Sequence, residues 1–354
     1  MLSGFEMKLF SEARFVADAP DHGPYDFLNS IVIPAFESDT FILKPGITLR
    51  TEWYLPSQVS PMKATDDDHY HGGWHDDELA ALVGLIFGVR IAAGPVDRDF
   101  ATGSDPLGRP RAYASSFAPN LPALTQRPQI PSIFGTRDLR DISLIDSFPE
   151  LERDGATCLV KSARLYQQAL WISDSAPEVS WLLLISSLET AASFHDTSDL
   201  HPLERLERSF PKLVEMLRED TDHRFVEKIA GELGKLTGAT GKFLRFCKDF
   251  SPGPPEERAE FGRVDFDPPA LSKALGKIYG YRSRALHGGT PFPAPMCQPP
   301  HTHINRDGFP EERPFSSAAS AKGATWVADD TPMLLHTFAY IARGALLNWW
   351  KSQI

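Results

Sequence analysis

The stretch Leu271-Ser-Lys-Ala-Leu-Gly-Lys-Ile-Tyr-Gly-Tyr-Arg282-Ser-Arg-Ala-Leu-His287-Gly-Gly decides how the C-terminal half of this chain folds. Leu271, Leu275 and Ile278 recur at the i, i+4, i+7 spacing of one helix face, so the pattern predicts an amphipathic helix. Arg282 falls at i+11 on the same apolar stripe. An arginine at a core-facing position is costly unless it is paired or functional, which makes Arg282 the first candidate site residue.

The predicted helix ends beside a histidine. His287 follows Arg282 by five residues, and Gly288 and Gly289 come directly after it. Glycine ends a helix readily because it adopts the left-handed conformation of a C-cap without steric cost. Residues five apart point about 140° away from each other on an ideal helix. His287 must therefore turn at the frayed helix end or face a second copy of the chain.

An upstream segment offers a partner for the arginine. In Glu178-Val-Ser-Trp-Leu-Leu-Leu-Ile-Ser-Ser-Leu-Glu189-Thr-Ala-Ala, one glutamate follows an apolar run. Glu189 shares a helix face with Leu182, Ile185 and Ala192, and a carboxylate on such a stripe needs a cation. Arg282 is the obvious candidate. The alternative to catalysis is then an internal ion pair that only sets the helix register.

The segment that carries Arg282 and His287 resembles the YRxRSxxxHG end of Apea-like HEPN domains, a helical family of prokaryotic defence and toxin proteins. The helix with Glu189 and the preceding Arg164-Leu-Tyr-Gln-Gln-Ala fit the same family. The resemblance begins at about Thr157, extends to the C-terminus and includes nothing before it. It implies an all-α HEPN bundle over residues 151–354.

The resemblance also implies an endoribonuclease that needs no metal or cofactor. The 2′-hydroxyl of the RNA would attack the adjacent phosphate while His287 moves a proton, because histidine titrates near neutral pH. Arg282 would hold the charge of the phosphorane, since its planar fork matches phosphate oxygens. Ser283 stands where the family often has Asn, Asp or His, and it would orient the imidazole from position i−4. Glu189 and Arg284 would support the site.

HEPN proteins usually juxtapose the motifs of two protomers, so the resemblance implies a homodimer. The chain that would bind this RNA partner is acidic. It has 36 Lys and Arg against 47 Asp and Glu, which gives a formal charge of −11. Such a field repels nucleic acid, so an RNA site must be a local basic patch. The alternative for these charges is a solvated helical face. The candidate patch comprises Arg224, Lys228, Lys235, Lys242, Arg245, Lys248, Lys273, Lys277, Arg282 and Arg284.

The chain shows no sign of export or membrane insertion. Its three cysteines, Cys158, Cys247 and Cys297, are an odd number without paired spacing, which favours a reducing cytosol. No segment reaches the uncharged length of a membrane span. We therefore expect a cytoplasmic protein without a membrane partner.

The fold class expected is α+β, with a mixed α/β N-terminal domain before the helical bundle. Residues 1–150 have short strands at 27–33 and 40–43, an edge strand at 47–55 and a helix at 76–90. Residues 94–131 are rich in Gly and Pro and predict a loop. This domain resembles nothing recognised. Its expected role is to sense a regulatory ligand or a phage trigger.

The C-terminal half predicts a series of helices and one long loop at 288–325. The last helix presents one apolar face and should pack back onto the bundle. That face carries Leu335, Phe338, Ala342, Ala345 and Trp349. The predicted helices cover residues 157–173, 177–195, 201–219, 222–249, 268–287 and 331–351.

Two clusters contain residue types that bind metals. Asp66 to Asp77 includes His69, His71 and His75, and carboxylates with imidazoles suit zinc or manganese. The spacing matches no known motif, and the acids also suit the start of the next helix. Cys297, His301 and His303 lack a fourth zinc ligand. Besides the ribonuclease, two hypotheses remain: a non-catalytic HEPN module for dimerisation or docking, and a metal-dependent hydrolase built on the N-terminal histidines.

Overall fold

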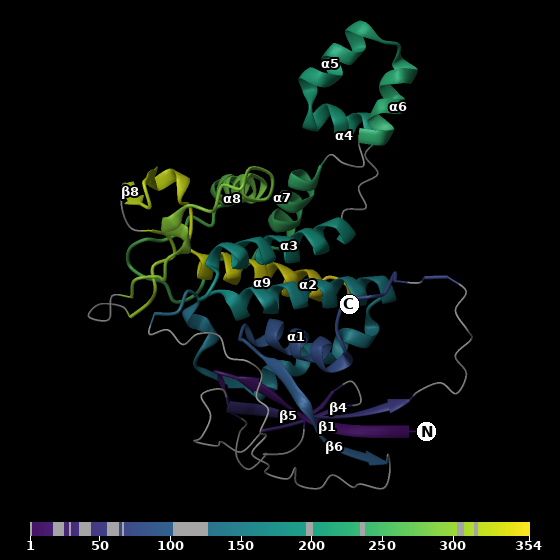
Figure 1. Cartoon of the computed structure of the whole chain (residues 1–354), viewed down its shortest axis with the longest axis vertical. Coiled ribbons are helices and arrows are strands. Elements are labelled where there is room, and N and C mark those ends of the chain that lie inside the picture. Colours follow the sequence, from purple (N-terminus) through teal and green to yellow (C-terminus); the bar gives the residue numbers. More distant parts are fainter. Residues whose placement is uncertain are drawn as a thin grey trace.

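A computed structural model describes residues 2–16, 25–27, 30–34, 44–54, 64–65, 67–101, 127–195, 201–233, 238–302, 308–314 and 318–354. The protein has the mixed α+β composition expected from the sequence. An antiparallel sheet lies at one end, helices are stacked above it, and a small helical unit stands at the far end (Figure 1).

The sheet has the strand order β3-β4-β5-β1-β6, and every neighbouring pair is antiparallel. On β1 and β5, the paired residues Met7 and Leu49, and Leu9 and Ile47, are buried in the core. These apolar residues alternate with others because successive side chains of a strand point to opposite faces. The strands are β1 (Leu2–Ser11), β3 (Tyr25–Phe27), β4 (Ser30–Pro34), β5 (Lys44–Tyr54) and β6 (Ala92–Ala101).

Several strand predictions were wrong in detail. Phe27 belongs to β3 and residues 30–33 belong to β4, and these two strands pair with each other, while residues 28 and 29 lie outside the described ranges. The predicted edge strand at 47–55 is interior, because β5 pairs with β4 on one side and with β1 on the other. Residues 94–101 belong to β6 instead of a loop. Pro95 is tolerated there because β6 is itself an edge strand. The predicted strand at 40–43 lies outside the described residues.

Helix α1 (His75–Phe87) packs against the sheet in one core cluster. It begins with three acids, as predicted for a helix whose N-terminal dipole favours negative charge. All residues from Leu79 to Phe87 are buried. Gly88 ends the helix in the left-handed conformation, with φ of 65°. Beside α1, the short strands β2 (Arg14–Val16) and β7 (Thr136–Asp138) pair in parallel, and the 3₁₀ segment η2 (Leu139–Glu150) follows.

The C-terminal half is mostly helical, as expected. The predicted helix at 201–219 is broken after Phe210, because Pro211 begins a new helix there. The predicted helix at 222–249 is also two helices, and Gly238 takes a φ of 103° before the second one. The helices are α2 (Arg153–Ile172), α3 (Pro177–His195), α4 (Pro202–Ser209), α5 (Pro211–Asp220), α6 (His223–Leu233), α7 (Ala239–Phe250), α8 (Pro268–Gly288) and α9 (Leu335–Lys351).

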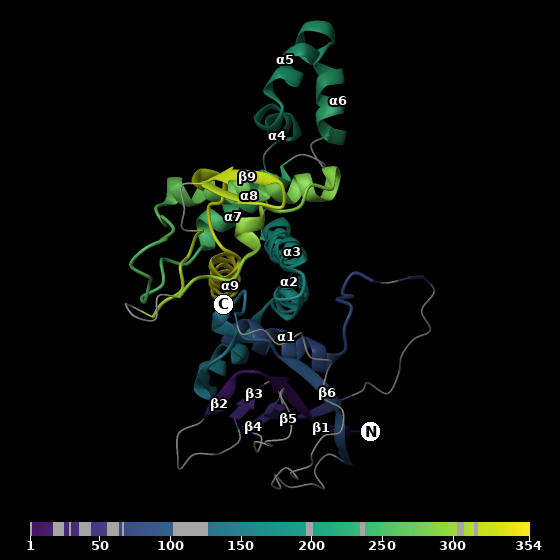
Figure 2. The ribbon, with the colours of Figure 1, turned by 60° about the vertical axis from the view of Figure 1, so that its left-hand side comes forward.

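The C-terminal half is not purely helical, however. The segment predicted as a loop at 288–325 contains the 3₁₀ turn η3 (Ala294–Cys297) and the strand β8 (Ala318–Ala321). β8 pairs with β9 (Ala324–Val327), and the 3₁₀ turn η4 (Ala328–Asp330) leads on toward α9. The β8–β9 hairpin lies over α8 (Figure 2).

A continuous hydrophobic core joins the two halves of the chain. Trp181 of α3 is fully buried and stacks on Phe338 of α9, with ring centres 4.9 Å apart. The same core cluster includes Leu85 of α1 and Ile47 of the sheet. The boundary proposed at residue 150 therefore lies within one packed core. By contrast, α4, α5 and α6 form a separate unit around Leu206, Val214 and Ala230 (Figure 1).

Candidate functional site

Helix α8 carries the candidate site residues, and its apolar stripe is placed as the sequence predicts. Leu271, Leu275 and Ile278 are buried in the core. The helix ends at Gly288, and Gly289 caps it with φ of 64° while its N–H donates to the carbonyl of Arg284. The helix and its glycine stop are therefore confirmed.

The arginine and the glutamate meet. The Nη2 of Arg282 donates to the Oε2 of Glu189 at 2.9 Å, and the Tyr279 hydroxyl donates to the Oε1 at 2.6 Å. Both carboxylate oxygens of Glu189 are thus occupied from one helix. The side chains of Arg282 and Glu189 remain only 23% and 18% exposed. The ion pair expected from the sequence is therefore confirmed.

Tyr279 is the residue of this group that sequence reasoning missed. Its pKa is raised, first by burial and then by the hydrogen bond to Glu189, so the phenol stays a proton donor. The guanidinium of Arg282 also lies 5.5 Å from the centre of the Tyr279 ring. The i, i+3 spacing of Tyr279 and Arg282 was the available signal, because residues three apart are neighbours on a helix.

The pairing leaves part of the Arg282 guanidinium unused. A guanidinium has five N–H donors, and Glu189 accepts from one nitrogen. The Nε of Arg282 is buried without a hydrogen-bond partner among the described residues. Arg282 is therefore held in place, with one buried donor left unsatisfied.

His287 lies on a different side of α8. It is exposed, and its neighbour Leu286 is 52% exposed. Ser283 is partly buried, and no hydrogen bond between described residues joins it to His287. Within one chain, the histidine is thus neither oriented by Ser283 nor directed toward Glu189.

A second set of cations shares the face of His287. Lys273, Lys277 and Arg284 precede the histidine by fourteen, ten and three residues, which places all of them within about 80° of it around the helix. Arg284 is exposed, and its guanidinium lies 4.5 Å from the centre of the Tyr281 ring. Of these three cations, Arg284 is the nearest to His287 along the helix, whereas Arg282 is turned toward α3.

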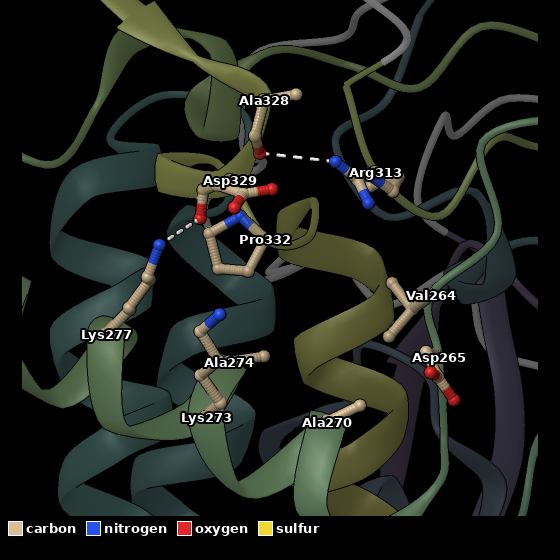
Figure 3. Close-up of a pocket in the computed structure, with 10 residues that line it drawn as sticks. All are labelled: Val264, Asp265, Ala270, Lys273, Ala274, Lys277, Arg313, Ala328, Asp329 and Pro332. Atoms are coloured by element: carbon tan, nitrogen blue, oxygen red, sulfur yellow. Dashed lines mark hydrogen bonds between the residues drawn. The ribbon is translucent and has the colours of Figure 1, made fainter.

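Two hollows adjoin the face of α8 that carries His287, which we call the outer face. The first lies between the N-terminal half of α8 and the turn before α9, as Figure 3 shows. The second lies between the C-terminal half of α8 and strand β9, and Lys277 lines both. The basic patch predicted from the sequence included Lys273 and Lys277. The sequence did not reveal that β9 forms the opposite wall of the second hollow, because β9 lies about 50 residues further along the chain.

The N-terminal histidine cluster is arranged around carboxylates. His71 Nε2 and His75 Nδ1 lie 3.9 and 3.6 Å from the Oε2 of Glu78. The backbone N–H of Trp74 donates to Asp77, which is the helix-start role expected for the acids. Within the ranges that the structure describes, no three His, Cys, Asp or Glu side chains are grouped to hold a metal ion. Asp66 lies outside these ranges.

The proposed zinc ligands of the long loop have separate surroundings. Burial raises the pKa of the Cys297 thiol to about 12, which disfavours the thiolate that binds zinc. His301 is exposed, and His303 lies outside the described residues.

Comparisons with known proteins add no relative. No protein-family model matches the chain, and no match was found among curated proteins or solved structures. Among the described residues, no helix has both the length and the apolar composition needed to cross a membrane.

Proposed function

We propose that this protein is a HEPN-type endoribonuclease that cuts RNA without a metal ion. The observation that carries the proposal is the arrangement at the end of α8. Arg282 is anchored by Glu189 while donors remain unused, and the exposed His287 closes the same helix two residues before the Gly289 cap. An anchored cation and a free imidazole are the two groups that metal-free cleavage requires.

In the proposed reaction, the 2′-hydroxyl of the RNA attacks the adjacent phosphorus. His287 accepts the hydroxyl proton, and the leaving 5′-oxygen takes a proton from a histidine or water. Arg282 and Arg284 offset the negative charge that builds on the phosphate oxygens. The bond to the 5′-oxygen breaks as the new P–O bond forms. The products are a 2′,3′-cyclic phosphate and a 5′-hydroxyl, with no redox change.

The proposed active form is a homodimer. Arg282 is turned toward α3, and His287 points about 140° away from it on the same helix. A two-fold axis beside the end of α8 would bring the histidine of one chain to the arginine of the other. Leu286, which is half exposed beside the histidine, supplies apolar surface for such a contact. In the cell, we propose a cytoplasmic role in phage defence or growth arrest, triggered through the N-terminal part.

A second function has an observation of its own. The Arg282–Glu189–Tyr279 contacts are those of a structural ion pair, so the helical part could serve only for dimerisation or docking. The metal-hydrolase alternative has no comparable support among the described histidines.

RNA cleavage by the purified protein tests the proposal. We expect cleavage in the presence of EDTA, cyclic-phosphate ends, and at least a hundred-fold loss in His287→Ala, in the range of general acid–base catalysis. His223→Ala is the matched control, because His223 is also an exposed helical histidine but lies on α6. Full activity of His287→Ala, or no cleavage of any RNA by the wild-type dimer, would favour the docking function.

A further inference from the structure

The two hollows on the outer face of α8 adjoin each other at Lys277, which lines both of them. The first is lined by Val264, Asp265, Ala270, Lys273, Ala274, Lys277, Arg313, Ala328, Asp329 and Pro332 (Figure 3). The second is lined by Lys277, Gly280, Tyr281, Arg284, Trp326 and Asp330. We call these two adjoining hollows together the α8 groove.

The cations of the α8 groove differ in how they are held by hydrogen bonds. Lys277 donates to the carbonyl of Asp329 at 2.6 Å and to the Oδ1 of Asp330 at 3.0 Å, so its position is fixed. Arg313 donates to the carbonyl of Ala328 at 3.2 Å, which leaves its other donors unused by that bond (Figure 3). Lys273 is exposed and makes no hydrogen bond or ion pair with the described residues. Such side chains suit the phosphates of an extended strand.

Aromatic rings line the second hollow beside the cations. The hydroxyl of Tyr281 donates to the carbonyl of Asp330 at 2.5 Å, and this hydrogen bond holds the ring in place. Arg284 lies over the Tyr281 ring, and Trp326 of β9 lines the same hollow from the opposite wall. Nucleic-acid bases stack on such rings whatever their sequence, and an adjacent arginine adds to the attraction.

The charge of the α8 groove favours a single strand over a duplex. Four cations line it, Lys273, Lys277, Arg284 and Arg313, against three carboxylates, Asp265, Asp329 and Asp330. The excess is therefore one positive charge, in a chain whose total is −11. A duplex concentrates two rows of phosphates, whereas a single strand separates its phosphates and exposes its bases. The α8 groove has charges of both signs and aromatic rings, so it suits a single strand better than a duplex.

We propose that the α8 groove binds single-stranded RNA and leads it to His287. From Lys273 to His287, the helix rises about 21 Å, so the face can contact several consecutive nucleotides. Phosphates would contact Lys273, Lys277 and Arg284, and one base would stack on Trp326. The identity of the ligand as the RNA substrate rests on the proposed function, whereas the position of the groove does not.

Binding can be measured apart from cleavage. The full-length His287→Ala protein is titrated with a fluorescent single-stranded oligoribonucleotide, and further changes are made in that background. We expect Lys273→Glu to weaken binding at least ten-fold and Trp326→Ala by about five- to hundred-fold, as base stacking predicts. The salt dependence of log K should become shallower by roughly 0.7 for each phosphate that a variant no longer binds. Lys248→Glu on α7 is the control, because it removes an exposed lysine of the same sequence patch away from the groove.

Several outcomes would overturn the inference. If Lys273→Glu leaves binding unchanged, or if Lys248→Glu weakens it equally, the α8 groove does not bind the RNA. If a duplex binds more tightly than the single strand, the site is not specific for single strands. A mononucleotide that competes as well as the oligonucleotide would assign the hollow to a free nucleotide. If groove variants lose binding but the wild-type protein cleaves no RNA, the proposed function fails and the groove stands. If the wild-type protein cleaves RNA and Lys273→Glu leaves cleavage unaffected, the proposed function stands and the α8 groove is not the substrate site.

Discussion

Arg282 at the end of α8 and Glu189 in α3, 93 residues earlier, form an ion pair of 2.9 Å that Tyr279 completes from the same helix. The pair ties the end of the motif-bearing helix to the centre of the bundle. Its members are neither exposed nor fully buried, so it lies between the surface pairs that contribute little and the buried pairs whose disruption is costly.

The first prediction concerns the stability of this pair. Arg282→Ala and Glu189→Gln should each lower the free energy of unfolding by about 1–3 kcal/mol, because each leaves a partly buried partner unsatisfied. The double variant should lose less than the sum of the two, as measured by denaturant titration. The exposed pair of Arg218 and Glu207 is the control, and Arg218→Ala should cost less than about 1 kcal/mol. Additive losses would show that Arg282 and Glu189 do not interact in solution.

The second prediction concerns alkaline pH. The folded state raises the pKa of Tyr279 above its ordinary value of 10.0, through burial and through Glu189. Between the unfolded and the folded pKa, the unfolded chain loses the phenol proton first, so stability falls as pH rises above about 10. Tyr279→Phe should therefore flatten the stability profile in this range relative to the wild type. Denaturant titrations from pH 8 upward measure it, and an unchanged slope would contradict the prediction.

The third prediction compares two helical glycines. Gly344 of α9 packs against the ring of Pro252 so closely that an added Cβ would overlap it, whereas a Cβ at Gly276 of α8 meets no atom within 4 Å. Gly344→Ala should destabilise the fold by about 1–3 kcal/mol through overpacking. Gly276→Ala should stabilise it by about 0.5–1 kcal/mol, because alanine loses less entropy in a helix. Thermal melts of the two variants should shift in opposite directions.

The fourth prediction tests the composite site. If Arg282 of one chain acts with His287 of its partner, the inactive variants Arg282→Ala and His287→Ala should complement each other. Random exchange gives half heterodimers, each with one intact site of two, so about a quarter of wild-type activity should return on mixing. Sedimentation of the full chain at tens of micromolar should show a dimer beforehand. A monomer, or mixed variants that stay inactive, would contradict the shared site.

The fifth prediction separates the proposed chemistry from metal catalysis. RNA cleavage should persist in EDTA and in the triple alanine variant of His69, His71 and His75. His71 and His75 are grouped with Glu78 near the start of α1, in a different part of the fold from the end of α8. Mass spectrometry of the cleaved ends should find cyclic phosphate. Loss of activity in EDTA that zinc or manganese restores would support the hydrolase alternative.

Local patterns explain how much could be predicted. The stripe of Leu271, Leu275 and Ile278 and the glycine stop predicted α8 nearly to the residue, because helix formation depends on neighbours within a turn or two. The same stripe predicted the partner of Arg282, since a charge among apolar side chains leaves few choices. The break at Phe210 was missed although Pro211 signals it, because the apolar periodicity continues across the proline.

Interactions between distant segments were beyond such patterns. The strand predicted at an edge became interior because the segment from Leu2 to Ser11 pairs beside it, and no local pattern encodes a pairing partner. The β8–β9 hairpin was predicted as loop for the same reason, so Trp326 was not connected with Lys273 and Arg284.

The sequence by itself determined the α+β class, the helix that bears the motif, its glycine end and the pairing of Arg282 with Glu189. Only the tertiary structure decided that strand β9 lies opposite Lys277 and Arg284 of α8, and that both halves of the chain share one core. The reason is physical. Helix periodicity and capping are set by interactions a few residues apart. The wall of a groove and the order of a sheet depend instead on which remote segments exclude water from each other most favourably.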